Sequence, residues 1–340
     1  MANLLTQSAG SRRDWVRTLT TMAGLAGMAG LALALTAGQA RAQADYPNKP
    51  VKVIVPFPAG TSPDVVARLW AERLSQALGQ PFVVDNRPGA ATIVGAQAAA
   101  TAPADGYTLL YTAQNTVSIN PFVYKNLPYK ADDFVPISQV AEVPLLLITS
   151  TKSNTRTLQE MIAQAKQNQG KFNFASFGIG QGTHVVMQRV LNAADIRMTH
   201  VPYRDGGMND VIAGNVDFSF DASTTAIPQI KAGKLRALAV SSTRRLDALP
   251  DVPTIAESIP GFMSDSWTGV LVRRGAPREV IQKISSETAK ILASESFQKR
   301  LSDVGLRTGL ADPAEFARFI ANESVVWSKV VRDNNISVEQ

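Results

Sequence analysis

The stretch that decides the fold is residues 51–78, VKVIVPFPAGTSPDVVARLWAERLSQAL. An apolar run of β-favouring residues leads into a loop with two prolines and a glycine, and then into a segment whose apolar side chains recur at helical spacing. Ser62 is expected to cap this helix, with Pro63 in its first turn and Gly79 at its end. In a parallel sheet, such a unit puts the loop at the carboxyl end of the strand, where open α/β sheets usually bind ligands.

The same alternation continues along the chain. Further strands are predicted at residues 82–84, 107–111, 145–149, 172–175, 198–201, 218–220, 235–240 and 267–272. Further helices are predicted at residues 157–167, 183–193, 208–213, 225–232, 277–292 and 313–331. This order predicts an α/β fold with largely parallel sheets covered on both faces. The length favours two lobes, and since no flexible linker separates them, we expect strands to cross between them.

The first 44 residues are typical of a secretion signal. Arg12 and Arg13 precede an uncharged apolar stretch at 19–37, and Ala-x-Ala patterns end at Ala42 and Ala44. We expect cleavage near one of these alanines and a periplasmic protein, by the twin-arginine or the general route; a membrane anchor is the alternative. Cleavage after Ala44 leaves about 296 residues and removes four arginines and one aspartate, so the net charge falls from +6 to +3. So mild and dispersed a charge argues against a nucleic-acid partner.

Composition excludes several kinds of chemistry. The chain has no cysteine and only two histidines, so disulfides, thiolate metal sites and a cysteine nucleophile are excluded. Neither a G-x-S-x-G elbow nor an H-E-x-x-H motif occurs. We therefore expect no catalytic residues, no metal and no cofactor, and a binding protein in place of an enzyme. A periplasmic hydrolase with a carboxylate pair stays an alternative.

A second loop also connects a predicted strand to the start of a predicted helix. The predicted strand at 172–175 leads into SFGIGQGTH, residues 176–184, and then into a helix. Its glycine spacing does not match a dinucleotide fingerprint and it has no P-loop lysine, so a carboxylate or another small anion at the helix start fits better. His184 is interpreted either as a ligand contact or as a packed side chain. Asn115, Tyr203 and Asp221 are added because each follows a predicted strand.

Several motifs in order carry a family resemblance. They are Tyr46-Pro47, Pro56-Phe57-Pro58-x-Gly60, Val84-Asp85-Asn86-Arg87-Pro88-Gly89, Ala104-Asp105-Gly106-Tyr107, His200-Val201-Pro202-Tyr203, Ala232-Gly233-Lys234-Leu235-Arg236 and Asp251-Val252-Pro253-Thr254. With them, the chain after residue 44 resembles the tripartite tricarboxylate transporter substrate-binding proteins, or Bug receptors. It departs from the family pattern at Ala59, at Thr61 and at residues 272–277.

The resemblance implies a two-lobed periplasmic-binding-protein fold of the type II kind. Lobe one would comprise residues 45–145 and 266–340, and lobe two residues 146–265. Such proteins capture a small mono-, di- or tricarboxylate, aromatic acids included, between the lobes. They act as monomers that serve a membrane permease of the tripartite tricarboxylate type or a sensor kinase. The candidate ligand-binding residues are Ala59, Gly60, Thr61, Ser62, Asp64, Asn115, Ser176, Gly178, Gln181, Thr183, His184, Tyr203 and Asp221.

Overall fold

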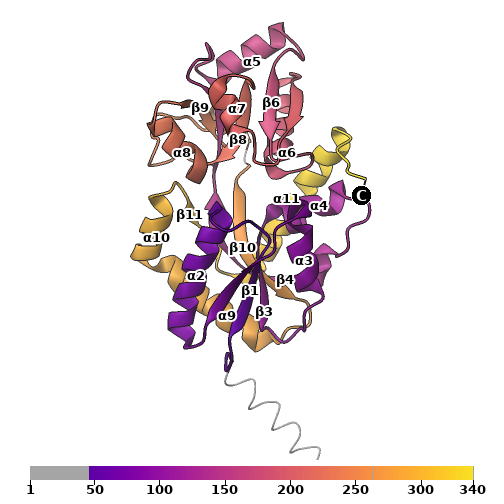
Figure 1. Ribbon diagram of the computed structural model, residues 1–340, viewed down its shortest axis with the longest axis vertical. Helices are drawn as coiled ribbons and strands as arrows, with labels where there is room; N and C mark the ends of the chain where they lie inside the picture. The colour runs from indigo at the N-terminus through magenta and orange to yellow at the C-terminus, as the bar shows by residue number, and fades with distance from the viewer. Residues whose placement is uncertain (1–45, 263, 340) are drawn as a thin grey trace, which may run out of the picture. The chain divides into compact units, whose positions relative to one another are not determined.

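The computed structural model describes residues 46–262 and 264–339 (Figure 1). The predicted secretion signal lies outside the described residues. Residues 49–340 form one unit of the chain, and the fold below is that of this unit. Among the described residues, no helix combines the length and the apolar character needed to span a bilayer.

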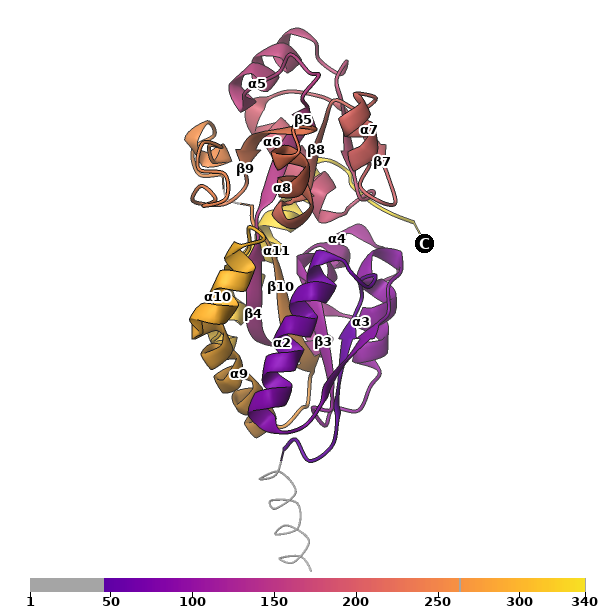
Figure 2. The same cartoon turned by 60° about the vertical axis from the view of Figure 1, so that its left-hand side comes forward.

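The first sheet has six strands in the order β11-β4-β10-β3-β1-β2. They are β1 (Val51–Val55), β2 (Phe82–Asn86), β3 (Thr108–Ala113), β4 (Phe134–Val143), β10 (Ser266–Arg273) and β11 (Arg307–Thr308). Its helices are α2 (Ser62–Leu78), α3 (Ile93–Ala100), α9 (Arg278–Ala293), α10 (Glu295–Ser302) and α11 (Pro313–Asp333). Figure 2 shows α2 beside α9, and α3 packs against β1 and β3. The sheet therefore draws strands from both ends of the described chain.

The second sheet is built from the middle of the chain. Its five strands run in the order β7-β6-β8-β5-β9. They are β5 (Leu145–Ser150), β6 (Asn173–Ser176), β7 (Thr199–Pro202), β8 (Phe218–Ala222) and β9 (Leu235–Val240). Its helices are α5 (Leu158–Gln167), α6 (Gly182–Ala194), α7 (Met208–Ala213) and α8 (Ser223–Lys231). Each predicted strand and helix is thus present, with its ends shifted by a few residues at most.

The expectation of largely parallel sheets is wrong. Strand β1 runs parallel to β2 and β3, and β6 runs parallel to β7 and β8. Strand β10 is antiparallel to β3 and β4, β11 is antiparallel to β4, and β5 is antiparallel to β8 and β9. The strands through which the chain leaves or re-enters a sheet are the ones that run against their neighbours, so both sheets are mixed.

The expected cap on α2 is also wrong. Thr61 occupies the position before the helix, Ser62 lies inside the first turn, and no side chain caps the helix start. The end of α2 agrees with expectation, since Gly79 adopts a left-handed conformation there with φ 69°. The start of α2 therefore keeps donors that a capping side chain would have used.

A single residue connects the two sheets on the outward path of the chain. Strand β4 ends at Val143 and β5 begins at Leu145, so only Pro144 lies between them. The chain returns to the first sheet between β9 and β10, through residues 241–265.

Strand register shows which strand ends lie at this crossing. In the first sheet, Val143 pairs with Ser266, the start of β10, and Ala113 at the end of β3 pairs with Thr268. In the second sheet, Leu145 pairs with Ala222 at the end of β8. Since β1 runs parallel to β3, and β6 and β7 run with β8, the carboxyl ends of β1, β3, β6, β7 and β8 all lie at the two edges that Pro144 joins. We call these the joined edges.

Buried aromatic side chains hold helices on the first sheet. Trp70 of α2 is fully buried, and its indole N–H donates to Thr288 Oγ1 of α9 at 3.1 Å. The same ring lies 5.8 Å from the ring of Tyr111 in β3. Trp267 of β10 meets Phe316 of α11 edge-on, with ring centroids 4.9 Å apart. Burial of one such side chain stabilises the fold by roughly 1.5–3 kcal/mol.

Candidate functional site

The first loop, residues 56–61, is fastened by a buried carboxylate. Asp64 is 2% exposed, and its Oδ2 accepts the Gly60 N–H at 2.8 Å and Arg68 Nε at 3.1 Å. Its Oδ1 accepts Asn86 Nδ2 at 2.7 Å. Burial raises the pKa of Asp64, but the hydrogen bonds from Arg68, Asn86 and Gly60 outweigh it and leave the pKa lowered. Asp64 is therefore ionised and already occupied, and it sets the shape of the loop.

The start of α2 presents unpaired donors. The Thr61 hydroxyl donates to Pro58 O at 2.7 Å and so does not cap the helix. Within the described residues, the N–H groups of Ser62 and Asp64 have no acceptor. The buried Ser62 Oγ has no partner there either. Ala59 is exposed beside them. Free donors at the positive end of a helix favour an anion.

The second loop, residues 176–181, is held by side chains of the helix that follows it. Gly180 N–H donates to His184 Nδ1 at 3.0 Å, and Phe177 N–H donates to Thr183 Oγ1 at 3.2 Å. Ser176 Oγ lies 2.6 Å from His200 Nε2 and accepts the Gly178 N–H at 3.1 Å. The side chains of Thr183, Ser176 and His184 thus accept hydrogen bonds from three N–H groups within the loop.

The start of α6 is a second uncapped helix terminus. Gln181 occupies the cap position without a side-chain hydrogen bond to the helix. The N–H groups of Gly182, Thr183 and His184 have no acceptor in the described part of the chain. The second loop therefore ends in donors of the same kind as the first.

Residues that follow β3 touch the second loop directly. Asn115, at the start of the π-helical turn Asn115–Ile119, donates from Nδ2 to Gln181 Oε1 at 2.9 Å. A Cβ added at Gly182 would lie 2.8 Å from Gln114 Nε2. Gln114 is 1% exposed, and its buried Oε1 has no partner among the described residues. The end of β3 and the start of α6 thus meet across the joined edges, where any side chain at position 182 would displace the end of the Gln114 side chain.

Two further predicted residues lie at the ends of β7 and β8. The Tyr203 N–H donates to Ser176 O at 2.9 Å, which ties the end of β7 to the second loop. Asp221 is 3% exposed, and its Oδ1 accepts the Ala222 N–H at 2.7 Å and the Thr225 hydroxyl. Burial raises the pKa of Asp221 to about 6, against the effect of these hydrogen bonds. All thirteen sequence-predicted residues therefore lie at or after the carboxyl ends of strands at the joined edges, with Ser176 and Asp221 still inside β6 and β8.

The sequence reasoning missed two residues of this region. Gln114 and His200 were not among the candidates. Gln114 directly precedes Asn115, and His200 lies inside β7, where its ring contacts Ser176. The available signal for His200 was its rarity, since the chain has two histidines and the other is His184. As for metals, the described residues contain no cluster of three or more His, Asp or Glu side chains suited to an ion.

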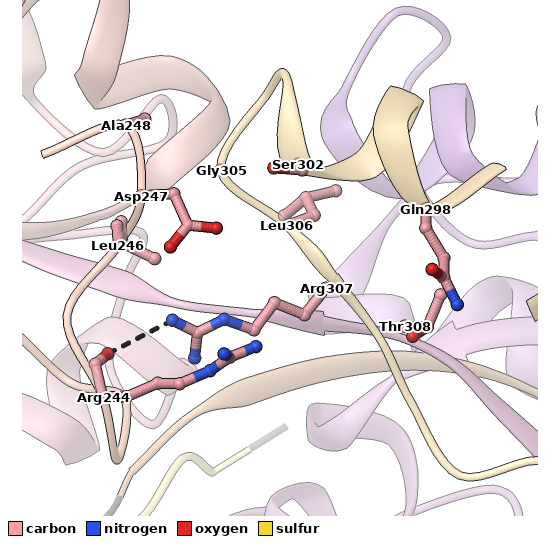
Figure 3. A pocket seen from close by; sticks show the side chains of 10 residues that line it. All are labelled: Arg244, Leu246, Asp247, Ala248, Gln298, Ser302, Gly305, Leu306, Arg307 and Thr308. Carbon is pink, nitrogen blue, oxygen red and sulfur yellow. Dashed lines mark hydrogen bonds between the residues drawn. The ribbon is translucent and has the colours of Figure 1, made fainter. Parts of the chain in front are cut away.

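A separate cavity lies along the return path of the chain (Figure 3). It has a volume of about 230 Å³ and is lined by the segment after β9, including Arg244 and Asp247, and by α10 and β11, including Arg307. Arg307 donates to Arg245 O at 2.8 Å. The cavity contains none of the predicted ligand-binding residues.

A half-buried acid ends this return path. Asp265 precedes β10 and accepts the Ser241 hydroxyl at 3.1 Å. Burial, together with the neighbouring charge of Glu142, raises the pKa of Asp265 to about 7. The Ser241 Oγ also accepts the N–H of Leu145, at 2.9 Å. One serine therefore links the outward and the return crossings.

Two sheets joined by crossing strands, with uncapped helix starts gathered at the joined edges, define a two-lobed solute-binding protein. Residues 66–336 match the model of the tripartite tricarboxylate transporter family receptor, and the chain belongs to this family. Its members are periplasmic solute receptors and not enzymes. The predicted family, fold class and non-enzymatic character are thereby confirmed.

Individual relatives extend over most of the chain. Protein BugT of Bordetella pertussis is 33% identical over 299 residues, which are 86% of this chain and 92% of BugT. The structure of Rpa4515 of Rhodopseudomonas palustris with adipate is 31% identical with a TM-score of 0.80, covering 86% of this chain and all of that one. MatC of the same organism, with bound malate, is 28% identical with a TM-score of 0.75, covering 84% of this chain and all of that one.

Proposed function

We propose that this protein captures a small mono-, di- or tricarboxylate at the joined edges by closure of its two lobes. The observation that carries the proposal is the pair of uncapped helix starts, at α2 and α6, whose N–H groups have no acceptor among the described residues. Such termini suit a carboxylate because they offer both donors and a positive dipole end. Adipate and malate in the two related structures support the same ligand class.

The lobes in this proposal follow the sheets. Lobe one comprises residues 45–145 and 266–340, and lobe two comprises residues 146–265. Residues 59–62 of the first loop and 176–183 of the second loop surround the carboxylate, with Asn115 and Gln181 between them. Asp64 is assigned to fastening the first loop, since both of its oxygens already accept hydrogen bonds. Tyr203 and Asp221 face the rest of the ligand.

The helix starts supply only part of the affinity. Each contributes roughly 0.3–2 kcal/mol toward an anion, whereas micromolar binding needs about 8 kcal/mol. Direct hydrogen bonds, such as one from the unpartnered Ser62 hydroxyl, supply about 1.5–3 kcal/mol each when the acceptor is charged. Bridging waters and burial on closure account for the remainder.

The cellular role follows from the family. We propose that the secretion signal is cleaved near Ala42 or Ala44, that the mature protein acts as a monomer in the periplasm, and that it delivers its ligand to a membrane permease of the tripartite tricarboxylate type. Delivery to a sensor kinase would use the same binding chemistry. Pull-down from membranes with the loaded mature protein distinguishes the two partners.

A thermal-shift screen tests the ligand class. The mature chain is titrated with adipate, malate, citrate, benzoate and the dimethyl ester of adipate, and an acid at one-hundredfold excess over its Kd adds about 2.7 kcal/mol of stability. Because the Ser62 Oγ has no partner in the described residues, Ser62→Ala is expected to weaken binding by about 10- to 100-fold at unchanged stability. Ser286→Ala on the exposed side of α9 is the matched control. No shift with any acid, or an equal shift with the ester, contradicts the proposal.

A further inference from the structure

The two histidines of the chain form one stack behind the second loop. Their ring centroids are 3.9 Å apart and the ring planes differ by 10°. Phe174 of β6 lies against both rings, with centroids 4.9 Å from His200 and 6.0 Å from His184. His184 is 6% exposed. Three aromatic rings therefore support the loop, of which Phe174 and His184 are buried and His200 is half-buried.

Each histidine holds part of the loop backbone. The Gly180 N–H donates to His184 Nδ1, which requires that nitrogen to be unprotonated and places the ring proton on Nε2. His200 Nε2 contacts Ser176 Oγ, which in turn accepts the Gly178 N–H. Gly178 and Gly180 have φ values of 121° and 74°, which L side chains rarely adopt. The two histidines are thus hydrogen-bonded, directly or through Ser176, to the amides of both glycines with positive φ in the loop.

The stack favours neutral rings. Burial lowers the pKa of His184 to about 3 and that of His200 to about 4, and the second ring lowers the pKa of His184 further. The elements around the pair carry further charged side chains, which are Arg189 on α6, Asp221 on β8, Arg204 and Asp205 after β7, Asp217 before β8, and Glu315, Arg318, Glu323, Lys329, Arg332 and Asp333 on α11. None of them is among the causes of either shift. Protonation of His184 at Nδ1 would replace the acceptor of the Gly180 N–H with a donor.

We propose that the rings of His184 and His200 position the second loop and so set its carboxylate affinity without themselves contacting the ligand. By engaging the amides of Gly180 and, through Ser176, of Gly178, they hold the loop in the conformation that leaves the amides of Gly182, Thr183 and His184 unpaired. This inference rests on the proposed function, because it assigns those amides to a carboxylate. The inference therefore assigns the His184 side chain to the support of the second loop and not to contact with the ligand.

The test uses the mature protein with two variants at one position. His184→Phe keeps a flat ring in the stack but removes the Nδ1 acceptor, whereas His184→Asn replaces the ring with an acceptor oxygen at the position of Nδ1. Adipate and malate are the probes, measured by calorimetry. His184→Phe is expected to lose at least 10-fold in affinity, and His184→Asn to stay within about 3-fold of the unsubstituted protein.

A pH profile separates positioning from general destabilisation. Affinity of the unsubstituted protein for the fully ionised form of each probe is expected to be constant from pH 8 to pH 6 and to fall below pH 5, as the rings take up protons. Since the chain has two histidines, nitrogen NMR of their rings reports each protonation step directly. Carboxylate affinity that stays constant while either ring protonates overturns the inference.

Two further readouts cover failure of folding or of the function itself. If His184→Phe does not fold, His200→Phe takes its place, because it keeps a ring in the stack but removes the Nε2 contact with Ser176 Oγ, and its expected result is the same loss of affinity. Protection of the Gly180 amide against hydrogen exchange is measured without ligand and is expected to be lost in His184→Phe. Retained protection and affinity in that variant overturn the role of the histidines alone. Absence of binding by the unsubstituted protein overturns the proposed function, and the positioning role with it.

Discussion

Gly180→Ala tests the contact between the second loop and the residues that follow β3. Gly180 has φ 74°, and a Cβ there would lie 2.5 Å from Val123 Cγ1, in the short helix α4 (Asn120–Val123). A left-handed conformation costs an L residue about 1–2 kcal/mol. Crowding a methyl into packed neighbours costs about 1–3 kcal/mol more. We therefore expect a loss of about 2–5 kcal/mol of stability, measured by urea unfolding.

The chain offers a matched control for this substitution. Gly170 has φ 78°, but a Cβ added there would meet nothing within 4 Å. Gly170→Ala therefore isolates the backbone cost, and its expected loss is about 1–2 kcal/mol. Combining Gly180→Ala with Val123→Ala completes a double-mutant cycle, with an expected coupling of about 0.5–3 kcal/mol. Equal losses at the two glycines, together with zero coupling, would refute the reasoning, because the loop would then not touch α4.

Three further predictions concern charged and titrating groups. Asp64→Asn is expected to lose about 1–3 kcal/mol of stability and to weaken carboxylate binding, because a buried charged acceptor is removed; Asp303→Asn, in an exposed ion pair with Lys299, is the control expected to lose less than 1 kcal/mol. With pKa values of about 3 for His184 and 4 for His200 in the fold and 6.5 unfolded, stability falls as pH decreases from 6.5, by about 2 kcal/mol per histidine at pH 5. Urea unfolding at pH 7.5 and at pH 5 measures this loss of stability, and the same pair of measurements on a variant lacking both rings isolates the part due to the histidines. If the variant loses as much stability between the two pH values as the unsubstituted protein does, the prediction is contradicted. Asp265 has the opposite slope, because its raised pKa of about 7 makes folding less favourable as pH rises from 3.8 to 7, so Asp265→Asn is expected to raise the melting temperature at pH 8.

Local sequence patterns were sufficient for most elements of the fold. Each predicted strand and helix forms, because apolar periodicity together with prolines and glycines at the ends marks them without tertiary information. Strand β4 was missed. Pro136 lies inside it, and a proline argues against a strand interior because it lacks an N–H. In the structure, Pro136 pairs with Leu271 at a register shift of β10, which is a place where the ladder tolerates proline.

The candidate site shows a different limit. The sequence placed thirteen residues after strand ends, and strand register brings those ends to the joined edges. The sequence did not reveal which hydrogen bonds each side chain makes at the joined edges. Asp64 and His184 were selected as ligand contacts, yet their polar atoms accept Gly60 and Gly180 amides. These bonds depend on backbone conformations at glycines, which the order of residues along the chain does not specify.

The position of β10 has a consequence for how the protein is made. This strand lies between β3 and β4 in the first sheet, yet it begins only at Ser266, after the whole second sheet has been synthesised. A nascent chain that stops before β10 has to leave β3 and β4 without the partner that joins them, whereas β5 to β9 are already complete. We therefore expect a chain truncated at residue 260 to protect the middle segment from protease and to leave residues 49–143 open to cleavage. Early protection of both segments would contradict this order, in which the last quarter of the chain determines when the first sheet can fold.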